Sequence, residues 1–309
     1  MAREAWNLGG DETAMANAIE RRRVTKRGVA AGLTQGIGRI SRRIEHDIQV
    51  PAIASAGVRR LSGLFLHRGV FLYRDSYGHV NEADLSDYME RSGFFGAHSP
   101  KLLRYIASVL RPGDWAIDIG ANVGLVSSPM AAAVGHGGRV SAVEPLARNI
   151  QRLEAFQKVN GLRQLEVIPV ALGSTKSTAR LRLSSLPGGS GTGSFVAPWA
   201  REEYVEVPTT TLDAVVEERR SDKPLRLIKM DVEGYEGEVV AGGERTFKEL
   251  RPFVLCELHD RLLRAAGLSA EGLLRMFAGM GYGPRSPFLP PRGSLEGTVS
   301  DVLLVPEGG

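Results

Sequence analysis

The chain has 309 residues, of which 43% are hydrophobic and 24% are charged, the composition of an ordinary globular protein. This length suffices for one large domain with an appended segment. No apolar stretch reaches the roughly 18 residues of a membrane span, and the first residues lack the apolar core of a secretory signal. The single cysteine excludes an internal disulfide. We therefore expect a cytoplasmic protein.

The net charge of +4 is concentrated at the start of the chain, where residues 1–60 hold 11 Lys/Arg and 6 Asp/Glu. A basic segment of this kind can bind nucleic acid or an anionic membrane surface. It lacks interleaved aromatic residues for base stacking, and the chain has no N-P-P-[YF] motif for a flipped base. We predict a solvated extension over 1–60, partly helical or disordered, and expect no nucleic-acid partner.

A cap segment is predicted over residues 61–110. Its first part reads as one or two short strands that are broken at residues 75–78, DSYG. A helix follows from the Ser99-Pro100 start, because apolar residues recur there at helical spacing. The turn at RPGD closes the segment, and the main domain is predicted over 111–309.

Strands and helices alternate along the main domain. The expected strands are DWAIDIG, GRVSAVEP, LEVIPVALG, LRLIKMDVEG and PFVLCELHD, and YEGEVVAGGERTFKEL is expected as one helix. Residues 174–211 interrupt the rhythm with β-rich, glycine-rich sequence, and the chain ends in two strands joined by a proline-rich loop. This pattern predicts an α/β fold with a mostly parallel sheet, covered on both faces, and an antiparallel strand near one edge.

A glycine turn, DIGANVGLVSS, follows the first of these strands at residues 118–128. Gly120 and Gly124 let the backbone approach a ligand closely. A dinucleotide site requires G-x-G-x-x-G, and here Asn122 and Leu125 replace the second and third glycines. The triphosphate motif G-x-x-x-x-G-K-[ST] is also missing. The turn therefore predicts another kind of ligand site at the carboxyl end of the sheet.

Two acids define that ligand. Asp118 ends the first strand, where it would repel phosphate and attract an ammonium or sulfonium group. Glu144 ends the second strand and can accept both hydroxyls of a ribose. Together they indicate S-adenosylmethionine, and the small Ala171 after the third strand would leave room for its adenine. The alternative is a simple turn flanked by two structural acids.

Candidate catalytic groups stand at the ends of the fourth and fifth strands. Asp231 and Glu233 are two residues apart, as are Glu257 and His259, so each pair shares a face if its strand persists. His259 is the preferred general base, because neutral imidazole is available near neutrality, and Asp231 is its rival. Lys229 is the expected salt-bridge partner of the acids. Such oxygen ligands suit Mg²⁺, but no D-x-x-x-D-D-like run favours a metal.

The sequence resembles the FkbM family of class I methyltransferases. The resemblance rests on DWAIDIGANVGLVS, SAVEP, VALG, TTTLDAVV, LIKMDVEGYEGEVVAGG and VLCELHD, and LIKMDVEGYE is the most specific of these stretches. It implies a Rossmann-like, seven-stranded sheet whose last strand is antiparallel, with S-adenosylmethionine as methyl donor. It adds four residues in or beside these stretches to the cofactor-binding residues: Asn122, Pro145, Asn149 and Asp231, the last of which is also a candidate base. Pro129 departs from the family pattern and is expected to kink the helix after the glycine turn.

These observations together predict an S-adenosylmethionine-dependent O-methyltransferase, with His259, Asp231 and Glu257 as catalytic residues. The acceptor is a hydroxyl of a small molecule, such as a sugar, a glycan or a polyketide-type natural product. Residues 174–211 and 285–297 are expected to recognise it, since loops on a rigid scaffold carry specificity. The alternatives are N-methylation of a peptide or protein, or a methyltransferase-like binding module without catalysis. The oligomeric state stays open, with a homodimer as one option.

Overall fold

A computed structural model gives the structure of residues 70–96, 98–184, 193–197 and 203–308. The predicted extension over 1–60 and most of the glycine-rich LPGGSGTGSF stretch lie outside these residues. The chain divides into two compact units with their boundary between His98 and Ser99. Within the described residues, no helix has the length and apolar character that a membrane crossing requires.

The smaller unit is a hairpin with one short helix. The one or two short strands that the sequence predicted are two, β1 (Val70–Arg74) and β2 (Val80–Asp84), and they pair antiparallel. The Asp75 carboxylate holds the turn between them by accepting the N–H groups of two turn residues. Helix α4 (Tyr88–Phe94) begins at Asp87, whose side chain accepts two backbone N–H groups. Four aromatic rings form the core of this unit: Phe71, Tyr73, Phe94 and Phe95.

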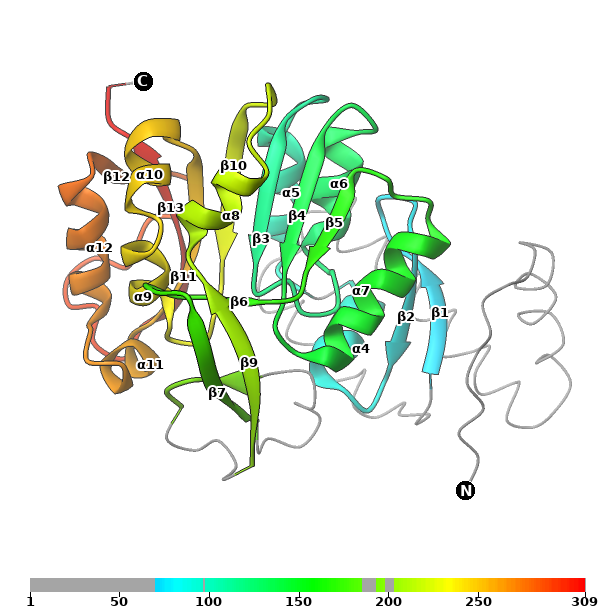
Figure 1. Cartoon of the computed structure of the whole chain (residues 1–309), viewed down its shortest axis with the longest axis horizontal. Coiled ribbons are helices and arrows are strands. Elements are labelled where there is room, and N and C mark those ends of the chain that lie inside the picture. The colour runs from blue at the N-terminus through cyan, green and yellow to red at the C-terminus, as the bar shows by residue number, and fades with distance from the viewer. Residues whose placement is uncertain (1–69, 97, 185–192, 198–202, 309) are drawn as a thin grey trace, which may run out of the picture. The chain divides into compact units, whose positions relative to one another are not determined.

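The larger unit contains a seven-stranded sheet with the order β12-β13-β11-β10-β3-β4-β5 (Figure 1). Its strands are β3 (Trp115–Ile119), β4 (Arg139–Val143), β5 (Leu165–Ile168), β10 (Leu225–Met230), β11 (Phe253–His259), β12 (Tyr282–Arg285) and β13 (Val299–Pro306). Neighbouring strands from β11 to β5 run parallel, whereas β13 is antiparallel to both β11 and β12. The fold is therefore Rossmann-like, and the predicted antiparallel strand is confirmed.

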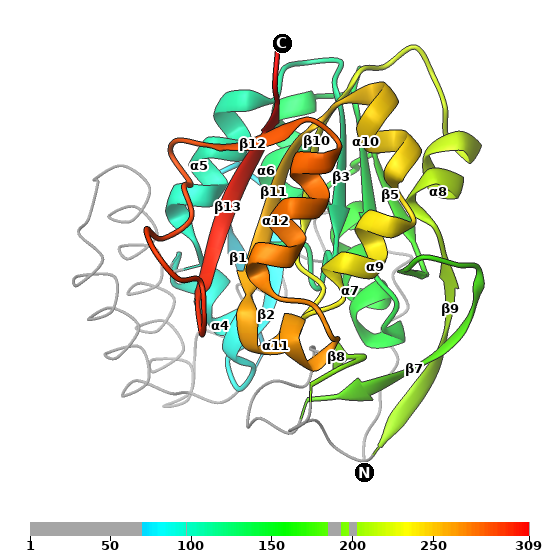
Figure 2. The ribbon, with the colours of Figure 1, turned by 90° about the vertical axis from the view of Figure 1, so that its left-hand side faces the viewer.

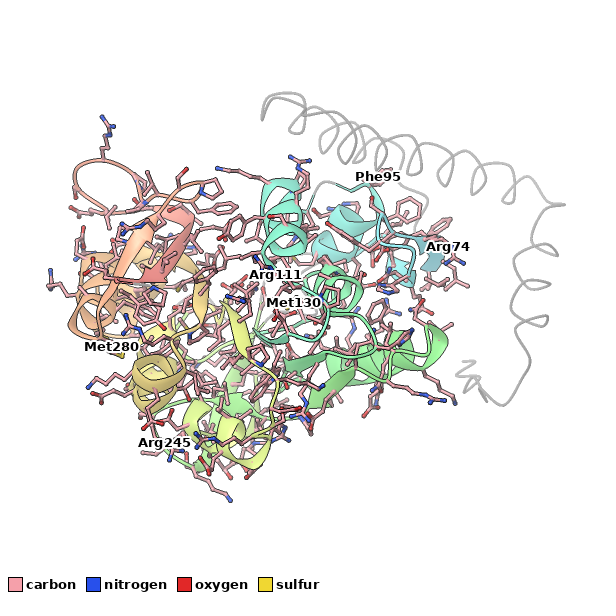
Figure 3. All side chains as sticks on the ribbon, turned by 90° about the horizontal axis from the view of Figure 1, so that it is seen from above. Arg74, Phe95, Arg111, Met130, Arg245 and Met280 are labelled. Atoms are coloured by element: carbon pink, nitrogen blue, oxygen red, sulfur yellow. The ribbon has the colours of Figure 1, made fainter. Side chains whose placement is uncertain are left out.

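Helices cover both faces of this sheet, which makes three layers (Figure 2). The helices of one face are α5 (Pro100–Val109), α6 (Ser127–Val134) and α7 (Ala147–Val159). The other face carries α8 (Leu212–Glu218), α9 (Glu236–Ala241), α10 (Glu244–Leu250), α11 (Asp260–Ala265) and α12 (Ala270–Gly279). Met130 of α6 lies in the interior, while Arg245 of α10 points outward (Figure 3). The core thus consists of two apolar clusters, one on each side of the sheet.

The expected third strand, LEVIPVALG, is divided between two sheets. Pro169 has no N–H to donate, and β5 ends just before it at Ile168. The next residues form β6 (Ala171–Leu172), which joins a second sheet of order β6-β9-β7-β8. Its other strands are β7 (Ser177–Leu183), β8 (Gly193–Ser194) and β9 (Tyr204–Thr210). Figure 1 shows β7 and β9 as a ribbon apart from the main sheet. This sheet contains the segment that interrupted the sequence pattern.

One local expectation was wrong, and a second one loses its reason. The single helix expected after β10 is two helices, since α9 ends at Ala241 and α10 begins at Glu244. At the junction Gly242 lies so close to Gly173 that a side chain on Gly242 would meet the Gly173 carbonyl oxygen at 2.0 Å. Pro129 is the third residue of α6, so it lies in the first turn. Backbone N–H groups of a first turn have no partner within the helix. Pro129 therefore costs α6 no hydrogen bond, and the reason for a kink disappears.

Candidate functional site

The glycine turn is packed tightly against the end of β10. Gly120 has φ 77°, and a Cβ atom on it would lie 1.9 Å from the Asp231 carbonyl oxygen. Gly124 has φ 91°, and its Cβ would come within 3.0 Å of the Leu153 side chain. Gly120 and Ala121 both donate their N–H groups to the Val143 carbonyl at the end of β4. Gly120 is thus required by the packing that joins the ends of β3, β4 and β10, whereas Gly124 is favoured by its left-handed backbone.

Replacing Gly120 by alanine should therefore destabilise the protein strongly. The change adds left-handed backbone strain to a direct collision, and we expect a loss of about 3 kcal/mol in the free energy of unfolding. Urea unfolding of Gly120→Ala and of Gly113→Ala tests this. Gly113 also has a positive φ of 94°, but no atom lies within 4 Å of its added Cβ. The control should lose only about 1 kcal/mol, and equal losses for the two variants would refute the packing argument.

Glu144 follows β4 and holds the glycine turn from the other side. Its Oε2 accepts the N–H of Asn122 at 2.9 Å, and its Oε1 accepts the N–H of Leu146 at 2.9 Å. Asn149 of α7 also hydrogen-bonds to this carboxyl group. Burial raises the pKa of Glu144, while these hydrogen bonds oppose the rise. The side chain is only 4% exposed, so a carboxylate stands in a fixed orientation beside the turn.

Asp118 lies in β3 and is fully buried. Its Oδ2 accepts a 2.6 Å hydrogen bond from the hydroxyl of Ser127, the first residue of α6. Its Oδ1 is buried without a hydrogen-bond partner. Burial raises the pKa of Asp118, and the charge of Lys229 opposes the rise. Asp118 is therefore less open to a ligand than the sequence suggested, and Ser127 is a contact that the sequence analysis missed.

Lys229 and Asp231 form the expected salt bridge, with 3.1 Å between Nζ and Oδ2. Lys229 stands opposite Asp118 in the parallel β10–β3 pair, and it is buried. Asp231 comes directly after β10, and its side chain is 31% exposed. Lys229 thus pairs directly with Asp231 and lies opposite Asp118 in the sheet, and the charges of both acids act on its ammonium group.

Asp231 and Glu233, the two acids of the MDVEG segment, do not share a strand face. β10 ends at Met230, and Glu233 has a left-handed backbone with φ 54°. The Ser194 hydroxyl donates to the Glu233 carbonyl oxygen at 2.8 Å and so holds this loop. Burial, followed by repulsion from Asp231, raises the pKa of Glu233 to about 7. The prediction that Asp231 and Glu233 share a face required β10 to continue through both residues. It fails because β10 ends at Met230.

Glu257 and His259 both belong to β11, so their expected common face is confirmed. Glu257 stands directly opposite Asp301 in the antiparallel β11–β13 pair. Repulsion from Asp231, followed by burial, raises the pKa of Glu257 to about 9, and burial raises that of Asp301. The Nδ1 atom of His259 is buried without a hydrogen-bond partner. Asp301 was missed because nothing in the sequence marks the register of β13.

The remaining predicted cofactor residues lie near the ends of β4 and β5. Pro145 directly follows Glu144 and is partly buried. Ala171 belongs to β6 and is buried in a small cluster with Leu146. Among the described residues, no group of three or more His, Cys, Asp or Glu side chains is arranged to hold a metal ion.

A family model, described as the methyltransferase FkbM domain, matches residues 118–283. The match covers more than half of the chain and includes the glycine turn, Glu144, Asp231 and Glu257. The family model thus places the chain in the methyltransferase class. More narrowly, the chain belongs to the FkbM methyltransferase family.

Several solved structures are similar to the chain at low identity. A methyltransferase FkbM from Methylobacillus flagellatus KT is 15% identical, with TM-score 0.39 over 82% of this chain and 59% of that one. A SAM-dependent O-methyltransferase from Thermotoga maritima is 14% identical, with TM-score 0.39 over 76% and 77% of the two chains. M. jannaschii TYW2 in complex with AdoMet is 14% identical, with TM-score 0.40 over 78% and 86%. The chain thus spans about three fifths of the FkbM structure's length. None of the curated proteins matches the sequence.

Proposed function

We propose that this methyltransferase transfers a methyl group from S-adenosylmethionine to a hydroxyl group of a small molecule, such as a sugar, a glycan or a polyketide-type product. The observation that carries the proposal is the row of charges across β3, β10 and β11. Asp118 and Asp231 flank Lys229, and Glu257 follows on the next strand. A donor-side acid and acceptor-side polar groups thereby stand side by side at the carboxyl ends of adjacent strands.

The residues beside β3 and β4 fit the donor. Glu144 is a fixed carboxylate that can accept ribose hydroxyls, as acids at this position do in nucleotide-binding βαβ units. Asp118 supplies negative charge for the ammonium or sulfonium group, and its Oδ1 has no protein hydrogen-bond partner. Around these acids we assign to the nucleoside site Gly120, Asn122, Gly124, Pro145, Asn149 and Ala171. The bound donor would supply an electrophilic methyl carbon.

The chain's task is then to hold the acceptor hydroxyl in line and to remove its proton. Asp231 and His259 are the two candidate bases. Asp231 directly follows β10 and His259 is the last residue of β11, so both stand at strand ends on the side proposed for the acceptor. Lys229 donates to Oδ2 of Asp231 and so fixes the orientation of this carboxylate at the end of β10. Glu257 has a pKa of about 9, so near neutrality it carries a proton and serves as a hydrogen-bond donor.

Separate substitution of the two candidate bases should identify the one that removes the proton. Loss of the base should lower the rate of methyl transfer by about 10²–10⁴-fold. His259→Asn and Asp231→Asn would be compared in turnover, with binding of S-adenosylhomocysteine as the control for an intact donor site. If both variants keep more than about a tenth of the rate, neither residue is the base.

The choice of a hydroxyl acceptor is tested with matched pairs of compounds. The purified protein is incubated with methyl-labelled S-adenosylmethionine and with sugars, polyols and phenols, each beside its amine analogue and a peptide mixture. The proposal expects label in a base-stable ether of a hydroxyl compound. Label only in amine or peptide products would replace O-methylation by N-methylation. Donor binding without transfer to any class would favour the binding-module alternative.

A further inference from the structure

Lys229 occupies the middle of the site without being an obvious reactant. It lies in β10, between the donor-side strand β3 and the strand β11 that carries Glu257. The residue is 6% exposed, and its Nζ donates to Asp231 Oδ2 at 3.1 Å. A buried ammonium is costly unless carboxylates pair with it. This position therefore requires an explanation beyond a surface ion pair.

Carboxyl groups from both strands that pair with β10, from the loop after β10 and from β13 act electrostatically on this ammonium. Those that interact electrostatically with Lys229 are Asp118 of β3, Asp231 and Glu233 after β10, Glu257 of β11 and Asp301 of β13. Three further charges interact with members of this group: Glu144 with Asp118, Glu236 of α9 with Glu233 and Glu257, and Lys101 of α5 with Asp301. The acids outnumber the lysines in this set, and each acid raises the pKa of its neighbours. The charge of Lys229 lowers these pKa values, so it favours the ionised form of the acids beside it.

The ammonium and its two nearest acids stabilise one another. Burial alone would lower the pKa of Lys229, but the charges of Asp231 and Asp118 raise it above its usual value. Lys229 is therefore a permanent cation and cannot act as a base. In return, its charge opposes the rise that burial causes in the pKa of Asp118. Without this cation, Asp118 and Asp231 would repel each other across two neighbouring strands.

We propose that Lys229 is a positioning residue, which keeps the donor-side Asp118 and the acceptor-side Asp231 ionised together and fixes one oxygen of Asp231. The donor side thereby keeps its negative charge for a cationic ligand while the acceptor side keeps its carboxylate. This inference rests on the proposed function, because it assumes that the ligand at Asp118 is the positively charged methyl donor.

The test is calorimetric titration of the full chain with S-adenosylmethionine and S-adenosylhomocysteine from about pH 6 to 9. In Lys229→Met the cation that opposes the rise is gone, so the pKa of Asp118 should move further up. Asp118 should then bind a proton at a pH where the wild-type residue is ionised, and the ligand's ammonium would lose its counter-ion. We expect affinity for S-adenosylhomocysteine to fall at least tenfold at about pH 7 and to recover as the pH rises. The loss should be larger for S-adenosylmethionine, because its sulfonium adds a positive charge. Lys229→Arg keeps the charge and should stay within about threefold of the wild type.

Controls separate this role from a structural one. Lys248→Met removes an exposed lysine that pairs with Glu244, and it should leave both affinities unchanged. If Lys229→Met does not fold, Lys229→Met/Asp231→Asn removes the ion pair as a unit. The double variant should still bind weakly at neutral pH, because burial, the largest cause, still raises the pKa of Asp118 and no cation opposes it, although the repulsion from Asp231 is removed. Affinities equal to those of the wild type at every pH would overturn the inference. A wild type that binds neither ligand would instead overturn the proposed function.

Discussion

Glu144→Ala should weaken the binding of S-adenosylhomocysteine by about a hundredfold or more. The carboxylate has two tasks, and alanine removes both. It would accept the ribose hydroxyls, and it already accepts the N–H groups of Asn122 and Leu146, which hold the glycine turn. Hydrogen bonds to a charged group contribute about 1.5–3 kcal/mol each, and 1.4 kcal/mol corresponds to tenfold in affinity. A loss of two such bonds accounts for the expected effect.

Two further variants give this experiment its contrast. Glu144→Gln keeps the shape and one acceptor oxygen, so its loss should lie between those of the wild type and Glu144→Ala. Glu166→Ala removes a carboxylate of β5, whose Oε1 lies 2.9 Å from Nε of Arg219. This variant should leave the affinity unchanged. Calorimetric titration measures all three. An affinity of Glu144→Ala within threefold of the wild type would place the nucleoside elsewhere.

Glu257→Gln should make the ligand-free protein more stable at about pH 8, by roughly 2 kcal/mol or about 5 °C in Tm. Repulsion from Asp231, together with burial, raises the pKa of Glu257 to about 9 in the folded protein, whereas the ordinary pKa of a glutamate is 4.5. The folded state thus binds a proton more tightly than the unfolded state does. The stability that comes from this proton is complete below about pH 4.5 and is lost as the pH rises through about 9.

Glutamine imitates the protonated form at every pH, so its advantage over glutamate should grow between about pH 5 and 9 and vanish in acid. Thermal unfolding at a series of pH values follows this difference. Glu249→Gln changes an exposed carboxyl of α10 and should show no such trend. A Glu257→Gln variant that is less stable than the wild type at about pH 8 would mean that Glu257 is ionised and paired. Such a result would remove the repulsion on which the account of this strand end depends.

The sequence predicted the fold because each signal was local. Apolar strands alternating with helices define a parallel sheet, and parallel strands bring their carboxyl ends to one edge. For that reason the sequence alone predicts that the acids at these strand ends lie near one another: Asp118, Glu144, Asp231 and Glu257. The salt bridge of Lys229 with Asp231 was expected as well, since Lys229 comes just before these acids in the sequence.

The missed features depend on long-range register or on backbone conformation. Asp301 lies opposite Glu257 because β13 enters the sheet antiparallel, and sequence spacing does not define that register. Glu233 adopts a left-handed backbone that carries it off the expected strand face. Ser127 reaches Asp118 from the start of α6, a contact set by how the turn folds. Charge and periodicity in the sequence identify the edge of the sheet, but not these pairings.

The most direct test of the donor site is a crystal structure of the protein grown with saturating S-adenosylhomocysteine. We predict that the ribose hydroxyls lie within hydrogen-bond distance of the Glu144 carboxylate and that the amino acid part of the ligand lies toward Asp118, over the Gly120 turn. A nucleoside bound elsewhere, with the edge formed by β3 and β4 empty, would contradict the assignment of Asp118 and Glu144 to the methyl donor.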